Sequence, residues 1–144
     1  MAAVSSQSCI GYGYVPARVV DSVFDAAARL LLPAGGALDA ISYSTGAGSH
    51  AVHPSLAPHD DAKPGPAQLL RLAAALRLEC RGGYMVGDHL SDLQAGRAAG
   101  VTPILVRTGG GRDTEQQLAG QAEWADLVIV DDLPAAARYI LKQG

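Results

Sequence analysis

Short apolar runs alternate with amphipathic segments along most of this chain, and this alternation limits its possible folds more than any other feature. The apolar runs predict strands at residues 2–5, 38–43, 84–87, 103–106 and 127–130. Helical spacing of apolar residues, with proline or serine at the expected starts, predicts helices from Pro16, Pro64, Ser91 and Pro134. Strands that alternate with helices form parallel sheets with right-handed crossovers. The sequence therefore predicts an α/β fold with a mostly parallel sheet that helices cover on both faces.

The composition indicates one domain over residues 1–144. The 144 residues are 49% hydrophobic and 17% charged, which suits a folded core. The formal charge of −3 and the scattered basic residues argue against nucleic acid and anionic membrane surfaces as partners. Two cysteines do not make a disulfide framework, and the pattern of residues predicts neither a signal peptide nor a membrane span. We therefore expect a cytoplasmic protein.

Two separate segments carry residues typical of phosphate chemistry. A short apolar run ends at Gly87-Asp88, and Asp92 follows one helical turn later. Open parallel sheets bind ligands at the carboxyl ends of their strands, and paired carboxylates there suit a hard cation such as Mg²⁺. Lys63, which arrives from another part of the chain, offers a point charge for a phosphoryl oxygen. The two segments together resemble half of a phosphate-transfer site.

The order of these motifs resembles the haloacid dehalogenase (HAD) superfamily of phosphatases. The resemblance rests on five segments: Val4–Ile10, Lys63-Pro64, Gly87–Asp92, Ala95–Gly100 and Ile104–Gly109. Within that superfamily the chain is most similar to the branch of heptose bisphosphate and histidinol phosphatases. The resemblance implies a HAD-like Rossmannoid three-layer sandwich and hydrolysis of a sugar phosphate monoester.

The resemblance also implies a role for each candidate residue. Mg²⁺ would be held by Asp88 and Asp92, and the phosphate of a small-molecule ester would be held by Ser5, Ser6 and Lys63. Simpler explanations exist for every one of these residues. Asp88 and Asp92 could stabilise a helix N-terminus, Lys63 could be an ordinary surface lysine, and Ser5 could merely end a strand.

The catalytic aspartates of this superfamily have no counterpart in the sequence. These enzymes form an aspartyl-phosphate intermediate on the first aspartate of an Asp-x-Asp motif, and the second serves as general acid and base. No Asp-x-Asp occurs in the 144 residues, so no catalytic residue can be assigned. In the order of the family the motif would precede Ser5, and we therefore expect an N-terminally truncated domain.

The strand that carries this motif is the central one in the resembled fold. Its loss would leave two open strand edges, which are candidates for self-association. Three explanations stay open: a fragment or misassigned start, a degenerate remnant, and a chain that a partner completes. The alternative function is accordingly a non-catalytic module that binds phosphate or a protein.

Residues 44–62 form an irregular stretch, which the resemblance places as a loop at the substrate entrance. It contains three histidines and the pair Asp60-Asp61, but lacks the cysteines that hold zinc in the resembled branch. A structural zinc is therefore not expected. Ala62 stands where the family has an arginine before the lysine, which weakens the heptose assignment.

Three further features favour structural explanations. His89 follows Asp88 directly, and neighbouring side chains at a strand end are expected to point apart. The segment Gly109–Arg112 lacks the ending that defines a phosphate loop, so we expect a flexible turn. The adjacent pair Asp131-Asp132 precedes Pro134, which predicts helix capping.

Overall fold

The computed structural model describes residues 1–56 and 61–144, which form two compact units. The first unit comprises residues 1–62 and 67–78, and the second comprises residues 63–66 and 79–144. Every strand of either unit that the structure describes pairs in parallel. No helix in the described residues is both long enough and apolar enough to cross a bilayer.

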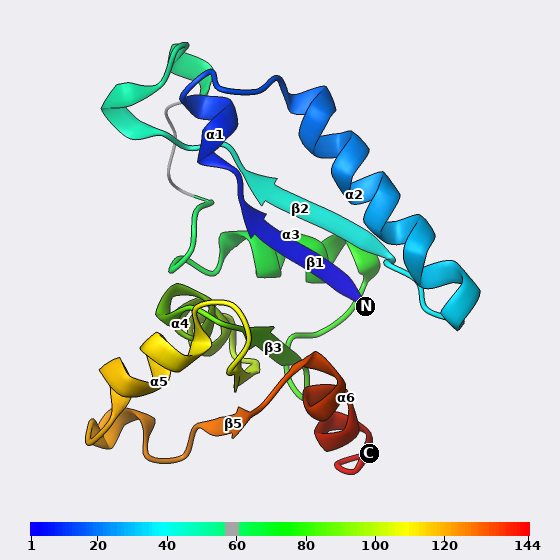
Figure 1. The fold of residues 1–144 in the computed structure, drawn as a ribbon, viewed down its shortest axis with the longest axis vertical. Coiled ribbons are helices and arrows are strands. Elements are labelled where there is room, and N and C mark those ends of the chain that lie inside the picture. Colours follow the sequence, from blue (N-terminus) through cyan, green and yellow to red (C-terminus); the bar gives the residue numbers. More distant parts are fainter. Residues whose placement is uncertain (57–60) are drawn as a thin grey trace. The chain divides into compact units, whose positions relative to one another are not determined.

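The first unit is built on a two-stranded parallel sheet (Figure 1). Its register runs from Ala2 opposite Ala40 to Ser6 opposite Ser44. The elements in chain order are β1 (Ala2–Ser6), α1 (Ser8–Gly11), α2 (Ala17–Leu31), η1 (Leu32–Ala34), β2 (Ala40–Ser44), η2 (Gly48–His50), η3 (Pro54–Leu56) and α3 (Ala67–Leu76).

Helices α2 and α3 pack against this sheet. Helix α2 begins after Pro16, and its Val20 side chain is buried. Phe24 of α2 stacks on Tyr43 of β2 with ring centroids 5.8 Å apart. Helix α3 contacts both strands, and the buried Gln68 amide donates a 3.3 Å hydrogen bond to the backbone oxygen of Ser5. The apolar spacing of α2 is only partly buried, because Val19, Val23 and Leu30 are exposed.

The second unit is built on a three-stranded parallel sheet of order β3-β4-β5. Its elements in chain order are β3 (Tyr84–Gly87), α4 (Leu90–Ala99), β4 (Thr102–Val106), α5 (Gly111–Leu118), η4 (Ala122–Trp124), β5 (Val128–Val130) and α6 (Leu133–Leu141). Asp132 caps α6 by accepting a 2.8 Å hydrogen bond from the Ala135 N–H. This bond confirms the predicted capping.

The central strand β4 divides the core of the second unit into two faces. Leu105 packs with Leu93, Leu118 and Trp124 on one face. Ile104 and Val106 pack with Ala136 of α6 on the other face. Successive side chains of a strand point to opposite sides, so one apolar strand supplies both clusters. This sheet is covered by helices on both faces, as the sequence predicted.

The parallel α/β architecture confirms the predicted fold class, with local differences. Helix α3 begins at Ala67 rather than at Pro64, and β2 begins at Ala40 rather than at residue 38. Helices α1 and α5 were not predicted, because neither has a clear apolar stripe. Strands β1 and β3 each pair with only one other strand among the described residues. Strands β2 and β5 also pair with only one described strand each, so open edges left at β1 and β3 by a missing strand stay a prediction.

Candidate functional site

Asp88 follows β3 directly at the carboxyl end of the second sheet, where three contacts hold it. Its Oδ2 accepts a 2.8 Å hydrogen bond from the Gly110 N–H, and its Oδ1 lies 2.9 Å from His89 Nδ1. Its backbone oxygen accepts a 2.8 Å hydrogen bond from the Thr114 hydroxyl. Partial burial raises the pKa of Asp88, but the contacts with Gly110 and His89 outweigh it and bring the pKa below its usual value. Asp88 is therefore a carboxylate at neutral pH.

Asp92 lies in the first turn of α4 and is almost completely buried, with 4% of its surface exposed. Its Oδ1 forms an ion pair with the Lys63 ammonium, and its Oδ2 accepts a 3.0 Å hydrogen bond from the His89 N–H. Gly87 is required beneath it, because a Cβ there would lie 2.3 Å from the Asp92 Cβ. The structure thus brings the predicted residues Lys63 and Asp92 into direct contact.

A metal ion could be held by a cluster of three residues in the second unit. Asp88, His89 and Asp92 each offer one ligand atom, and these atoms lie within 4.8 Å of one another. The expectation that His89 points away from Asp88 is wrong, since its ring contacts the Asp88 carboxylate. The local rule for a strand does not apply there because β3 has already ended at Gly87.

The segment Gly109–Arg112 is only partly the predicted turn: Gly109 and Gly110 lie in a turn, whereas Gly111 and Arg112 belong to helix α5. Gly111 begins helix α5, and the residues before it lie against Asp88. Sequence reasoning missed both contacts with Asp88: the one from the Gly110 N–H and the one from the Thr114 hydroxyl. One available signal was the position of the glycines directly after a strand next to β3, at the same edge of the sheet as Asp88.

Ser5 and Ser6 lie in the first unit, at the carboxyl end of β1. The Ser5 hydroxyl accepts a 2.8 Å hydrogen bond from the Gln7 side-chain amide, and Ser6 is exposed. The carboxyl end of a parallel strand agrees with the position expected for a phosphate ligand. Their participation in one site with Lys63 stays a prediction.

The predicted entrance loop, residues 44–62, contains the short helices η2 and η3. Ser44 is buried at the end of β2, and Asp61 forms a 3.1 Å ion pair with Arg71. His59 and Asp60 lie outside the described residues. The role of this loop in admitting substrate stays a prediction.

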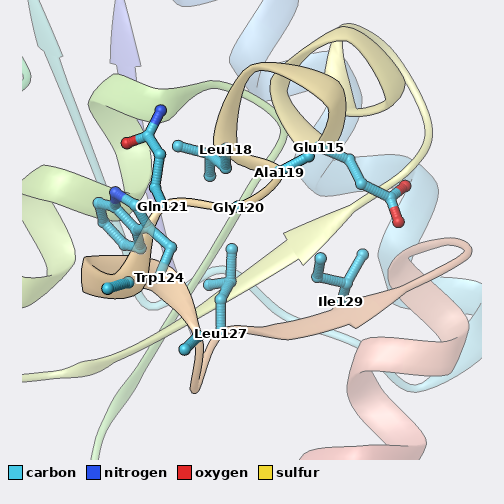
Figure 2. A pocket seen from close by; sticks show the side chains of 10 residues that line it. Glu115, Leu118, Ala119, Gly120, Gln121, Trp124, Leu127 and Ile129 are labelled. Atoms are coloured by element: carbon cyan, nitrogen blue, oxygen red, sulfur yellow. The ribbon is translucent and has the colours of Figure 1, made fainter.

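A shallow apolar pocket lies elsewhere in the second unit (Figure 2). Leu118, Trp124, Leu127 and Ile129 surround it, and none of the predicted site residues lines it. It lacks converging polar groups of the kind that orient a phosphate ester. The chemistry of the candidate site therefore lies around Asp88 rather than in this pocket.

Comparison with known families gives one match over much of the chain. The HAD-hydrolase-like family model matches residues 61–136, which include Lys63, Asp88 and Asp92. The chain is 30% identical to the D-glycero-beta-D-manno-heptose-1,7-bisphosphate 7-phosphatase of Pseudomonas putida, covering 98% of this chain and 74% of that protein. It is 32% identical to the enzyme of the same name from Bordetella bronchiseptica, covering 97% of this chain and 73% of that protein.

Two solved structures that are similar to this chain are also of phosphatases. One is the D,D-heptose 1,7-bisphosphate phosphatase of B. bronchiseptica complexed with magnesium and phosphate, with a TM-score of 0.78 and 30% identity. That alignment covers 98% of this chain and 73% of the other. A putative HAD-like phosphatase from Mesorhizobium loti has a TM-score of 0.75 and 26% identity, over 98% of this chain and 65% of the other.

Proposed function

Because the chain belongs to the HAD-like hydrolase family, we propose that it forms the cation- and phosphate-binding part of a sugar phosphate phosphatase. The names of its relatives suggest a heptose bisphosphate as the substrate class. One observation carries the proposal: Lys63 contacts Asp92, whose carboxylate lies within 4.8 Å of the ligand atom that Asp88 offers. This contact supports the proposal, because it holds the lysine that we assign to phosphate close to the carboxylate that we assign to the cation.

We assign Asp88 as a ligand of Mg²⁺. Carboxylate oxygens suit this hard cation, and the low pKa of Asp88 keeps the side chain charged. A bound Mg²⁺ would offset negative charge on the phosphoryl group. The Gly110 N–H holds Oδ2, so we assign Oδ1, which lies 2.9 Å from His89 Nδ1, to the cation.

Lys63 is assigned to the phosphoryl oxygens, and Asp92 orients it. Both oxygens of Asp92 already have partners, namely the Lys63 ammonium and the His89 N–H. That Asp92 also ligates Mg²⁺ therefore stays a prediction. Ser5 and Ser6 are assigned to the remaining nonbridging oxygens through their hydroxyl and amide groups.

Nucleophilic attack on phosphorus is assigned to an aspartate outside these 144 residues, since Asp-x-Asp does not occur among them. The chain itself then contributes binding, positioning and electrostatic stabilisation. The comparisons do not favour the alternative of a non-catalytic module, because the relatives that they name are phosphatases.

Two further assignments accompany this function. The open edges of β1 and β3 are proposed sites of self-association, which sedimentation at increasing protein concentration would detect. A reducing cytoplasm suits the free thiols of Cys9 and Cys80, and cell fractionation tests this location.

The proposal is tested by calorimetric titration of the 144-residue chain with Mg²⁺ and then with a heptose bisphosphate. Asp88→Asn should weaken Mg²⁺ binding at least about tenfold, because it removes a charged ligand. Lys63→Met should weaken binding of the phosphate ester by a similar factor, because a charge-assisted contact is lost.

Matched controls are available for both substitutions. Asp113 is an exposed acid in the first turn of α5, and Lys142 is the only other lysine of the chain. Asp113→Asn and Lys142→Met should each change affinity less than about twofold. Absence of Mg²⁺ binding would reject the proposed function, and phosphate release by the chain alone would reject an external nucleophile.

A further inference from the structure

The loop between β4 and α5 lies directly against Asp88. This glycine loop comprises Thr108, Gly109, Gly110 and Gly111. The Gly110 N–H donates a 2.8 Å hydrogen bond to Asp88 Oδ2. Thr114, in the first turn of α5 and 5% exposed, donates its hydroxyl proton to the Asp88 backbone oxygen at 2.8 Å. The loop and the helix start therefore hold both the side chain and the backbone of Asp88.

The glycines permit this contact because no larger residue would fit. Gly109 has φ +61°, and a Cβ on it would lie 2.2 Å from Asp88 Oδ2. A Cβ on Gly111 would lie 1.7 Å from the backbone oxygen of Val106. Contacts this short do not occur in folded proteins, so a side chain at position 109 would displace the Asp88 carboxylate.

An ion-pair clamp holds the two ends of the glycine loop together. Arg107 at the end of β4 donates two hydrogen bonds to Glu115 of α5, at 2.7 and 2.8 Å. Its remaining terminal nitrogen donates a 2.8 Å hydrogen bond to Asp131. A two-point guanidinium–carboxylate contact restricts both position and orientation. The clamp therefore limits how far the glycine loop can move from Asp88.

We propose that the glycine loop and Thr114 are positioning elements that orient the Asp88 carboxylate for a divalent cation. This inference rests on the proposed function, in which Asp88 ligates Mg²⁺. By occupying Oδ2 and fixing the backbone, the loop leaves the cation to bind at Oδ1, on the side of the carboxylate that lies 2.9 Å from His89 Nδ1. Groups that orient a metal ligand in this way commonly change metal affinity about 10- to 100-fold when they are altered.

The test is Mg²⁺ affinity, measured by calorimetry on the 144-residue chain with Gly109→Ala and Gly120→Ala. Both glycines have left-handed backbone, with φ +61° and +78°. A Cβ on Gly120 would meet no described atom within 4 Å, whereas one on Gly109 would meet Asp88. Both substitutions introduce similar backbone strain, so only displacement of Asp88 distinguishes them. Gly109→Ala should weaken Mg²⁺ binding at least about tenfold and Gly120→Ala less than about twofold.

A second pair of variants keeps the test decisive if Gly109→Ala does not fold, as circular dichroism would show. Thr114→Val removes the hydroxyl at nearly constant volume, and Thr114→Ser retains it. Thr114→Val should weaken Mg²⁺ binding several-fold, and Thr114→Ser should restore the wild-type affinity to within about twofold. Thr102→Val, at an exposed position of β4, is the matched control.

The outcomes separate this inference from the proposed function. If the wild type binds Mg²⁺ and Asp88→Asn abolishes it, but Gly109→Ala equals Gly120→Ala and Thr114→Val equals Thr102→Val, the positioning role alone is overturned. If the wild type binds no Mg²⁺, both proposals are overturned, because there is then no cation for Asp88 to hold.

Discussion

The contact between Lys63 and Asp92 joins two largely buried charged side chains of the second unit. Their side chains are only 14% and 6% exposed. Charges removed from water are costly, and each of these two depends on the other for compensation. A buried pair of this kind adds little net stability but makes loss of either partner expensive.

We expect Asp92→Asn to lower the free energy of unfolding by about 3 kcal/mol, because Lys63 is left buried without a counter-charge. Urea denaturation measures this value. The control is a double-mutant cycle with Lys63→Met, in which the double variant should be more stable than the sum of the single losses predicts. Additive losses would contradict the pairing.

Glycines determine how closely α4 packs on β3. A Cβ on Gly96 would lie 2.8 Å from the Met85 Cβ and 3.4 Å from Val101 Cγ2. Gly96 lies within the helix and is buried, where glycine is otherwise unfavourable. Close packing of helix and strand therefore outweighs helix propensity at this position. The same packing fixes Asp92, which lies one turn earlier on α4, against Gly87.

Gly96→Ala should therefore lower the free energy of unfolding by about 1 to 2 kcal/mol, because overpacking exceeds the gain in propensity. Thermal denaturation followed by circular dichroism measures the change. Ala98, exposed on the same helix, gives the reference: Ala98→Gly should cost about 1 kcal/mol from propensity alone. A more stable Gly96→Ala protein would show that the helix has room to accept a methyl group.

The two units differ in how much apolar core they possess. In the first unit the buried apolar residues are Ile10, Val20 and Ala47. Both buried clusters of the structure, built around Leu105 and around Ile104, lie in the second unit. Apolar burial is the main source of stability, so the second unit should resist unfolding more strongly.

Urea unfolding followed by two probes measures this difference and tests the predicted single domain. The only tryptophan, Trp124, reports on the second unit, whereas far-ultraviolet circular dichroism reports on both. We expect the second unit to unfold at a urea midpoint about 1 M above that of the first unit. This follows from about 1 kcal/mol of extra stability at an m-value near 1 kcal/mol/M. The tryptophan signal should then change at higher urea than the first part of the circular dichroism signal. Coincident transitions would instead support one cooperative domain over residues 1–144.

The sequence by itself determined the features that depend on neighbouring residues. The spacing of apolar residues predicted the order of strands and main helices, and Asp132 was recognised as a helix cap. The strand order and the helix cap follow from local periodicity and local hydrogen bonding, which a sequence displays directly. Lys63, Asp88 and Asp92 became candidates for the site through the resemblance of their motifs to a known family.

Only the tertiary structure decided how these residues are held. The Lys63 ion pair, the glycine loop against Asp88 and the Arg107 clamp all join residues that lie in different parts of the chain. The apolar spacing also could not show that α5 begins at Gly111, because this helix has no clear apolar stripe. The start of the helix instead follows from the packing of the preceding loop on Asp88. Such contacts depend on which strands become neighbours in a sheet, and the order of strands in a sheet cannot be predicted from a local sequence pattern.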